Sequence, residues 1–196
     1  MADHRDKLRR YDSKRDFART PEPRSGGHRR DEDDPRFVIQ HHQATADHYD
    51  FRLEIDGVLV SWAVPKGPST DPRERRLAKR TEDHPLEYED FEGVIAKGQY
   101  GGGTVQVWDR GTFRNASHDG DRPLQAPDAL ERGHLTIVLR GQKISGGYSL
   151  FRTRGDGMWL LVKKRDADAD ARRNPTRTQT ESVLSGRTMD QIAEDS

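Results

Sequence analysis

The sequence predicts a mainly β protein: a small antiparallel β-barrel with little helix and with polar N- and C-terminal extensions. Three observations predict it, namely short β-rich runs broken by turn residues, scarce helical periodicity, and apolar residues gathered in the middle of the 196-residue chain. We therefore expect a charged N-terminal arm over residues 1–35, a barrel domain over 36–165 and a polar tail over 166–196. A chain of this length has room for one core.

Short runs rich in β-branched and aromatic residues are the predicted strands. They are Arg36–Gln40, Tyr49–Ile55, Val58–Val64, Thr104–Trp108, Leu135–Arg140, Tyr148–Thr153 and Met158–Lys163. Asp56-Gly57, between the second and third runs, is typical of a two-residue hairpin turn, because both residue types accept a positive φ at low cost. Such neighbouring runs pair as antiparallel strands, which favours a barrel or sandwich over a βαβ fold.

Helix is expected at two places only, over Pro72–Glu82 and over Thr188–Glu194. The arm has no amphipathic period long enough for a helix, so we expect it to be extended. The glycine-rich run Gly98–Gly103 is followed by a strand-like segment rather than a helix start. It therefore predicts a sharp turn or bulge and not a phosphate-binding loop.

Composition excludes several classes of protein. The chain has 34 basic and 34 acidic residues, so its formal net charge is zero and attraction to an anionic partner must come from local patches. It has no cysteine, which excludes a disulfide framework and a thiolate metal site. We find no signal peptide and no apolar run of membrane-spanning length, and therefore expect a cytoplasmic monomer with no membrane partner.

The polar side of the run Tyr49–Ile55 predicts a metal site. Side chains alternate along a strand, so His48, Asp50 and Arg52 share one face. An ordinary polar face is merely solvated, but this one places an imidazole, a carboxylate and a guanidinium at successive positions, with His42 six residues upstream. Two imidazoles and one carboxylate suit manganese, iron or zinc, so we predict that His42, His48 and Asp50 hold a divalent cation.

Three further residues favour phosphate chemistry beside this cation. The planar guanidinium of Arg52 fits phosphate oxygens bidentately. His84 precedes Pro85, which favours extended backbone, and its imidazole is our candidate proton donor to a leaving oxygen because imidazoles titrate near neutral pH. Lys66 lies on a rigid loop after a strand and is either a phosphate ligand or an exposed turn lysine.

Several motifs along the chain identify a family. They are FVIQHHQATADHYDFRLE (37–54), SWAVPKGPS (61–69), EDHPLEY (82–88), DFEGVI (90–95) and GTVQVWDRGT (103–112). Lys14-Arg15-Asp16-Phe17 in the arm and Gly155-Asp156-Gly157 near the end of the barrel belong to the same set. The set closely resembles the 3'-phosphoesterase domain of bacterial DNA ligase D, and the resemblance covers nearly the whole chain.

This resemblance implies a manganese-dependent enzyme that processes the 3' end of a primer strand in nonhomologous end joining. In that family a 3'-terminal ribonucleoside is removed to leave a 3'-phosphate, which is then hydrolysed to a 3'-hydroxyl. The implied partner is a DNA primer-template with either end, and a DNA ligase or Ku is a further candidate. By motif, the metal ligands match His42, His48 and Asp50, the phosphate-binding residues match Arg52, His84 and Tyr88, and supporting positions match Arg15, Asp16, Glu22, Gln40, Lys66, Arg76 and Glu82.

The sequence departs from the family pattern at a few positions. His41 stands where lysine is common, Asp47 where leucine is common, and residues 96–99 (AKGQ) where PEGE is common. By strand alternation His41 and His42 point to opposite faces, so only one of them can join the site. No proposed ligand is lost, but substrate range and the balance between the two reaction steps stay open.

Two other functions also stay open. Two histidines and one carboxylate on a β-barrel describe a non-haem iron oxygenase as well, although the additional cationic residues Arg52, Lys66 and Arg76 favour phosphate. The second alternative is a non-catalytic module that binds DNA ends or a repair partner and uses its metal structurally. Basic residues in the arm and over residues 73–80 would hold a nucleic-acid backbone in either case.

Overall fold

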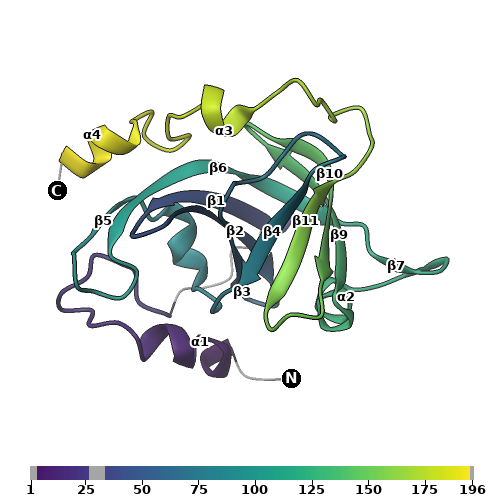
Figure 1. The fold of residues 1–196 in the computed structure, drawn as a ribbon. Helices are drawn as coiled ribbons and strands as arrows, with labels where there is room; N and C mark the ends of the chain where they lie inside the picture. The colour runs from purple at the N-terminus through teal and green to yellow at the C-terminus, as the bar shows by residue number, and fades with distance from the viewer. Residues whose placement is uncertain (1–3, 27–33, 195–196) are drawn as a thin grey trace.

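The computed structural model, which describes residues 4–26 and 34–194, is a closed antiparallel β-barrel (Figure 1). The barrel strands follow the order β1-β2-β3-β4-β11-β10-β9-β6, and β6 pairs back to β1 to close the ring, while β5 adds to β6. Closure leaves few exposed strand edges, which would otherwise invite association. The strands are β1 (Arg36–Gln43), β2 (Asp47–Ile55), β3 (Val58–Val64), β4 (Arg75–Arg80), β5 (Gly93–Ile95), β6 (Gly103–Asn115), β7 (His118–Asp119), β8 (Arg122–Pro123), β9 (His134–Gly141), β10 (Ser145–Arg152) and β11 (Met158–Lys163).

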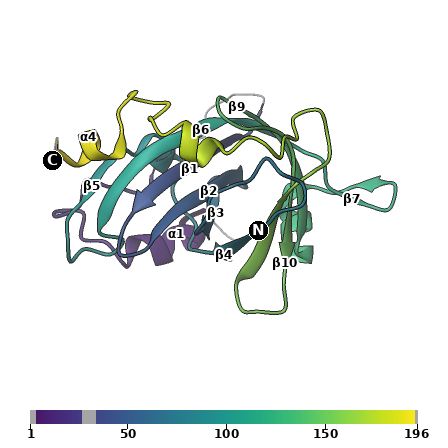
Figure 2. The ribbon, with the colours of Figure 1, turned by 45° about the horizontal axis from the view of Figure 1, so that its top comes forward.

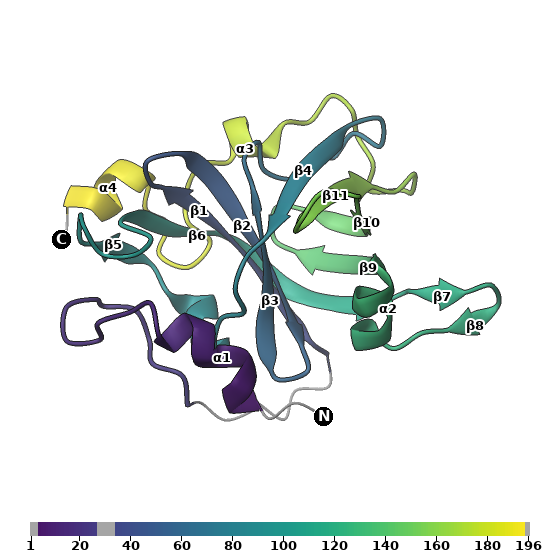
Figure 3. The ribbon, with the colours of Figure 1, turned by 60° about the horizontal axis from the view of Figure 1, so that its bottom comes forward.

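The predicted fold class, a mainly β barrel with little helix, is confirmed. The helices are short: α1 (His4–Asp12), the 3-10 helix η1 (Leu86–Asp90), α2 (Ala126–Arg132), α3 (Pro175–Thr178) and α4 (Met189–Glu194). The predicted hairpin turn is present, with Asp56 and Gly57 both at positive φ (57° and 80°) between β2 and β3. Strands β7 and β8 form a separate ribbon that projects from the barrel (Figure 3).

The predicted helix over Pro72–Glu82 is wrong. Residues 75–80 form β4, which pairs with β3 on one side and with β11 on the other. Ala78 points inward and is fully buried, while Arg75 and Lys79 are exposed. The segment tolerates a helix locally, but the barrel needs a strand here to close, and such tertiary pairing outweighs local propensity.

The expectation of a wholly extended N-terminal arm is also wrong, because residues 4–12 form α1. Leu8 and Tyr11 lie on one face of this helix and are fully buried. Two apolar anchors are too few to give a helical period in the sequence. Figure 3 shows α1 lying beside β3, and residues 1–3 and 27–33 of the predicted arm lie outside the described residues.

The C-terminal segment runs along the barrel over β6 (Figure 2). Trp108 Nε1 donates to the backbone oxygen of Gln179 at 2.8 Å, and Ile192 of α4 is buried. The short helix expected over Thr188–Glu194 corresponds to α4, whereas the division of the chain at residue 166 stays a prediction. Among the described residues, none of the helices has the length and apolar content needed to cross a membrane.

Two apolar clusters cover opposite faces of strands β1–β3. One contains Phe51 and Trp62 together with most of the barrel core. The other contains Val38 and includes Tyr11 of α1 and Tyr88, which belongs to η1. The polar side chains of β2 lie on this second face, so α1 and η1 turn what looks like a solvated strand face into a covered site.

Asp109 of β6 ties the barrel to the turn before β10, and its loss should destabilise the fold. The carboxylate is fully buried and accepts backbone N–H bonds of 2.9–3.1 Å from Arg110, Gln142, Lys143 and Ile144. Asp109→Ala leaves these donors unpaired, so we expect the free energy of unfolding in urea to fall by about 2–4 kcal/mol. Asp109→Asn keeps one acceptor oxygen and should cost less. Wild-type stability of Asp109→Ala would contradict this role.

Candidate metal and phosphate site

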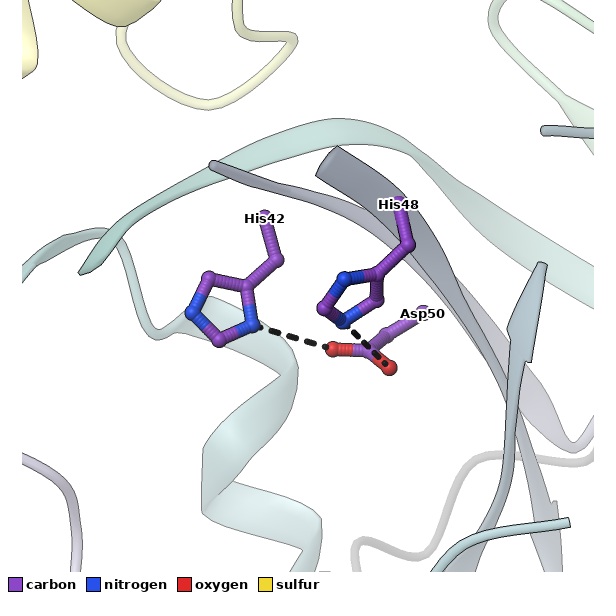
Figure 4. Close-up of side chains that lie close together, drawn as sticks. All are labelled: His42, His48 and Asp50. Atoms are coloured by element: carbon purple, nitrogen blue, oxygen red, sulfur yellow. Dashed lines mark ion pairs between the residues drawn. The ribbon is translucent and has the colours of Figure 1, made fainter. Parts of the chain in front are cut away.

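Three candidate metal-binding side chains converge on the covered face of β1 and β2 (Figure 4). The antiparallel register sets His42 directly opposite His48, and Asp50 follows two residues later on the same face. Asp50 Oδ2 lies 3.7 Å from His42 Nδ1, and Asp50 Oδ1 lies 3.6 Å from His48 Nε2. Metal bonds of about 2.0–2.2 Å hold their donor atoms about 3–3.5 Å apart, so these three residues fit one cation with little movement.

Backbone carbonyls fix which nitrogen of each histidine faces the site. His42 Nε2 lies 2.9 Å from the carbonyl oxygen of Gly101, and His48 Nδ1 lies 2.9 Å from that of Ala46. A carbonyl only accepts, so each of these nitrogens carries the proton. His42 Nδ1 and His48 Nε2, the nitrogens nearest Asp50, are then left with lone pairs for a metal.

The charges around Asp50 favour its ionised form. Burial alone would raise the pKa of this carboxyl, but the Arg52 guanidinium and the neighbouring imidazoles of His42 and His48 hold the pKa well below its usual range. Burial opposes a charge on His48, yet the hydrogen bond to Asp50 and the charge of that carboxylate raise the pKa of His48. The site therefore has an anionic centre that attracts either a proton or a cation.

Arg52 is buried beside Asp50 and held from several sides. Its Nη2 donates to Asp50 Oδ2 at 3.0 Å, its Nε to Gln40 Oε1 at 2.7 Å, and its Nη1 to Ser61 Oγ at 2.9 Å. The amide nitrogen of Gln40 donates in turn to the backbone oxygens of Tyr88 and of Phe91, which follows η1, each at 2.9 Å. The guanidinium is thus fixed before any substrate arrives.

A second guanidinium reaches the site from the N-terminal arm. Arg15 donates to Glu22 Oε1 at 2.8 Å and to Glu82 Oε1 at 2.9 Å, and its guanidinium lies 3.7 Å from the centre of the Tyr11 ring. All three charged side chains are almost fully buried. Tyr11, in the last turn of α1, therefore helps to position Arg15. The carboxylates of Glu22 and Glu82 compensate the charge of Arg15.

The surroundings of His84 favour its neutral form, and its predicted role as proton donor to a leaving oxygen stays a prediction. Burial, followed by the charges of Arg52 and Arg15, holds the pKa of His84 well below its ordinary value. Its Nδ1 lies 2.9 Å from Arg52 Nη1 and 3.0 Å from the carbonyl oxygen of Glu82. A neutral ring satisfies only one of these partners at a time, so His84 acts as a hydrogen-bonding group rather than as a cationic acid.

Tyr88 stays protonated beside it. Burial and the Glu22 carboxylate raise the pKa of Tyr88 well above its ordinary value. Its hydroxyl donates to Glu22 Oε1 at 3.0 Å, and the Arg52 guanidinium lies 4.9 Å from the centre of its ring. Tyr88 therefore links the two guanidinium networks.

These side chains surround a cavity of about 280 Å³. Most of the lining residues were predicted from the sequence as site residues. The predicted residues in the lining are Arg15, Glu22, His42, His48, Asp50, Arg52, Glu82, His84 and Tyr88. The cavity thus gathers the three candidate metal ligands, the imidazole of His84 and both guanidinium groups.

Four other predicted site residues do not line this cavity. Gln40 lies behind Arg52, and Asp16 is exposed and accepts the Ala18 N–H at 3.1 Å, which stabilises a turn. Lys66 and Arg76 line a separate cleft of about 410 Å³ formed with the strand β4. The predicted phosphate contacts of Lys66 and Arg76 stay predictions.

Two departures from the family pattern contact each other. His41 Nε2 lies 2.8 Å from Asp47 Oδ1, and the His41 ring stacks on Tyr49 with centroids 4.3 Å apart. His41 therefore faces away from His42, as strand alternation predicts. The His41–Asp47 pair lies on the face opposite His42, so these two departures leave the candidate metal ligands unchanged.

Sequence reasoning missed six residues that line the cavity: Ala44, Ala63, Thr81, Ile95, Tyr100 and Gly101. The run Gly98–Gly103 is a turn, as predicted, and Gly101 has a φ of 73°. In the sequence, the feature that marks this turn is an aromatic residue, Tyr100, among several glycines. A search for a phosphate-binding loop does not detect such a feature. The contact that reveals it, between the Gly101 carbonyl and His42, joins residues 59 apart in the chain.

Comparison with known proteins places this barrel and its site in one family. The family model of the DNA ligase D 3'-phosphoesterase domain matches residues 40–152. The chain is 48% identical over 189 residues to the multifunctional non-homologous end joining protein LigD of Pseudomonas aeruginosa, covering 93% of this chain and 22% of that protein. It is 47% identical over 155 residues to the corresponding DNA repair protein LigD of Mycobacterium tuberculosis, covering 79% and 19%.

A third relative is the LigD protein of Mycolicibacterium smegmatis, which is 44% identical over 161 residues, 82% of this chain and 21% of that protein. The chain therefore spans about a fifth of the length of these relatives. It belongs to the DNA ligase D 3'-phosphoesterase domain family, as the sequence motifs indicate.

Metal affinity should fall as pH decreases. A bound cation must displace the proton of His48, whose pKa Asp50 raises above 6.5, so competition begins above that pH. We expect Mn²⁺ affinity, measured by calorimetry, to drop by up to about tenfold per pH unit for this one displaced proton. His48→Ala should weaken binding and flatten the pH profile, while His118→Ala, on the exposed ribbon, should change neither. A pH-independent affinity across the imidazole titration range would contradict the ligand assignment.

Proposed function

We propose that this protein is a metal-dependent DNA 3'-end-processing phosphoesterase in nonhomologous end joining. It would remove a 3'-terminal ribonucleoside and then the remaining 3'-phosphate to leave a 3'-hydroxyl. The observation that supports it most directly is the fixed Arg52 guanidinium, 3.0 Å from the Asp50 oxygen of the candidate metal site. Membership of the phosphoesterase domain family and the end-joining names of the relatives support the substrate class.

The residues His42, His48 and Asp50 would hold the metal, which we propose to be manganese. Imidazole and carboxylate donors accept manganese, and also iron and zinc. When bound, the cation would supply Lewis-acid stabilisation of a phosphate oxygen and a more acidic water. The backbone carbonyls of Gly101 and Ala46 accept hydrogen bonds from the two imidazoles and keep both rings oriented for it.

Phosphate ester hydrolysis asks mainly for positioning and for stabilisation of charge on the equatorial oxygens, and it needs no covalent nucleophile. Arg52 would donate to these oxygens, since Gln40 and Ser61 already orient its guanidinium. Arg15 would add positive charge from the opposite wall. Neutral His84 and protonated Tyr88 would orient the phosphate through hydrogen bonds rather than by proton transfer.

The remaining predicted residues would act around this centre. Glu22 and Glu82 hold Arg15 in place. Lys66 and Arg76 would bind backbone phosphates in the neighbouring cleft, since both residues line it. Asp16 would act indirectly through the turn that follows Arg15. A ligase or Ku partner, a monomeric state and a cytoplasmic location stay predictions.

Replacing Arg52 should nearly abolish turnover. Removal of one charge-stabilising donor commonly costs about 10²–10³-fold in rate, so we expect a loss of this size for Arg52→Ala at saturating Mn²⁺. Because Asp50 and Gln40 lose a partner, a melting curve and a Mn²⁺ titration must accompany the rate measurement. Arg114→Ala, which removes an exposed arginine of β6 that lines neither the cavity nor the neighbouring cleft, is the matched control and should keep its rate. A folded, metal-binding Arg52→Ala protein with near wild-type rate would refute the assignment.

Gel electrophoresis of a labelled primer tests the reaction itself. We expect a 5'-labelled primer-template with one terminal ribonucleotide to be converted first to the 3'-phosphate and then to the 3'-hydroxyl product with Mn²⁺, and not with chelator. A primer that begins with a 3'-phosphate should enter the second step directly. DNA binding without any product would favour the non-catalytic module, and oxygen consumption with 2-oxoglutarate alongside inert DNA would favour the oxygenase.

A further inference from the structure

Tyr100 stands at the cavity as an exposed aromatic ring that the proposed chemistry does not use. It is 49% exposed and lines the cavity together with Gly101. Of the exposed large apolar side chains in the described residues, the others, Leu77, Phe151 and Leu184, do not line this cavity. Its location is therefore specific to the site.

From this placement we infer that Tyr100 is a stacking platform for the base of the 3'-terminal ribonucleoside. The inference rests on the proposed function and extends it, because it names the residue that recognises the leaving nucleoside. Aromatic side chains bind single nucleotides in this way, since every base has a face that stacks.

The hydroxyl end of Tyr100 is fixed while much of its ring is open. Lys14 Nζ donates to the Tyr100 hydroxyl at 2.8 Å, and Lys14 also pairs with Glu82 Oε2 at 2.5 Å. The Tyr100 hydroxyl lies 3.5 Å from the same carboxylate oxygen. A ring anchored at one end loses little further freedom when a base stacks on it, which favours binding.

The turn that holds Tyr100 is tied to the candidate metal ligands. The carbonyl of Gly101 accepts the His42 Nε2 proton, so the residue next to Tyr100 contacts a ligand directly. A side chain at Gly103 would meet the backbone oxygen of Gln43 at 2.3 Å, so the turn lies tightly against the end of β1. The distance between ring and metal site is therefore set by backbone contacts on both sides.

Cavity size places the base at the mouth. The cavity of about 280 Å³ is smaller than the about 300–1,000 Å³ of pockets that enclose a drug-sized ligand. It has room for a phosphate with its adjoining sugar atoms, but the base of the same nucleotide must lie nearer to solvent. Tyr100 is the aromatic side chain available there.

Positive charge lies over the ring. Lys14 Nζ and the Arg15 guanidinium lie over the Tyr100 ring, 4.2 Å and 5.4 Å from its centre, so a base must stack on the exposed part of the ring that these cations leave open. Cations beside an aromatic platform attract the phosphate attached to a stacked base, and this combination is typical of single-strand nucleic-acid sites. Stacking and charge therefore act on the same nucleotide.

The two proposed steps differ in whether this base is present. In the first step the oxygen of water bonds to phosphorus, the bond from phosphorus to the 5'-oxygen of the terminal nucleoside breaks, and that oxygen takes a proton. In the second step the oxygen of a second water bonds to the same phosphorus, the bond to the 3'-oxygen of the primer breaks, that oxygen takes a proton to become the 3'-hydroxyl, and inorganic phosphate leaves. Only the first substrate has a terminal base for Tyr100.

Steady-state kinetics on both substrates with Mn²⁺ test this asymmetry. For Tyr100→Ala we expect the KM of the ribonucleotide-ended primer to rise about tenfold with little change in kcat, and the KM of the 3'-phosphate primer to stay within about twofold. Tyr100→Phe keeps the ring but loses the hydroxyl contacts to Lys14 and Glu82, so its KM for the ribonucleotide-ended primer should lie much closer to wild type than to Tyr100→Ala. Phe151→Ala removes an exposed aromatic side chain from β10, outside the cavity, and should affect neither.

A substrate with an abasic terminal ribose completes the comparison. The wild-type protein should lose about the same tenfold on this substrate, and Tyr100→Ala should lose nothing further, because the stacking partner is already absent. Equal losses on both primers, a Tyr100→Phe protein as weak as Tyr100→Ala, or additive losses on the abasic primer would each overturn the inference.

Binding measurements separate this inference from the proposed function. If wild-type protein cleaves neither primer, the proposed function fails. Fluorescence anisotropy with the base-containing and abasic primers then tests the stacking role of Tyr100 independently. A preference for the base that Tyr100→Ala removes and Tyr100→Phe retains would support it, and no preference in the wild-type protein would refute it.

Discussion

The contact between Asp50 and Arg52 is the interaction on which the site depends. Two charges buried side by side cost solvation free energy, and the cost is offset only when every remaining donor and acceptor is satisfied. Here Gln40 and Ser61 satisfy Arg52, while two imidazoles face the carboxylate. A carboxylate that can bind a cation and a guanidinium that can bind an anion are thereby held 3.0 Å apart.

This contact exists because the polar face of β2 is covered. Tyr11 and Tyr88 bring α1 and η1 over it, and the same layer delivers Arg15 to Glu82, a residue 67 positions away in the chain. Removing water from such a site strengthens its electrostatics: burial lowers the pKa of His84, and the Arg52 charge outweighs burial at Asp50 and lowers its pKa as well. The covering layer therefore shapes the electrostatics of the site together with the candidate ligands.

The two parts of the chain have different tasks. All residues that line the cavity lie between Arg15 and Gly101, whereas β6 and β9–β11 complete the barrel that supports them. The C-terminal segment adds to this support through Trp108 and the buried Ile192. A barrel closed by remote strands keeps the β1–β2 register rigid, and that register sets the spacing of the candidate ligands.

The sequence by itself determined the barrel class, the turn at Asp56-Gly57 and the shared face of His48, Asp50 and Arg52, because alternation and turn chemistry depend on neighbouring residues. Its motifs also identified the family. Only the tertiary structure decided that residues 75–80 form a strand, that Arg15 enters the cavity while Lys66 stays outside it, and that His84 is neutral. Those outcomes depend on burial and on pairing between distant segments, which a local pattern does not contain.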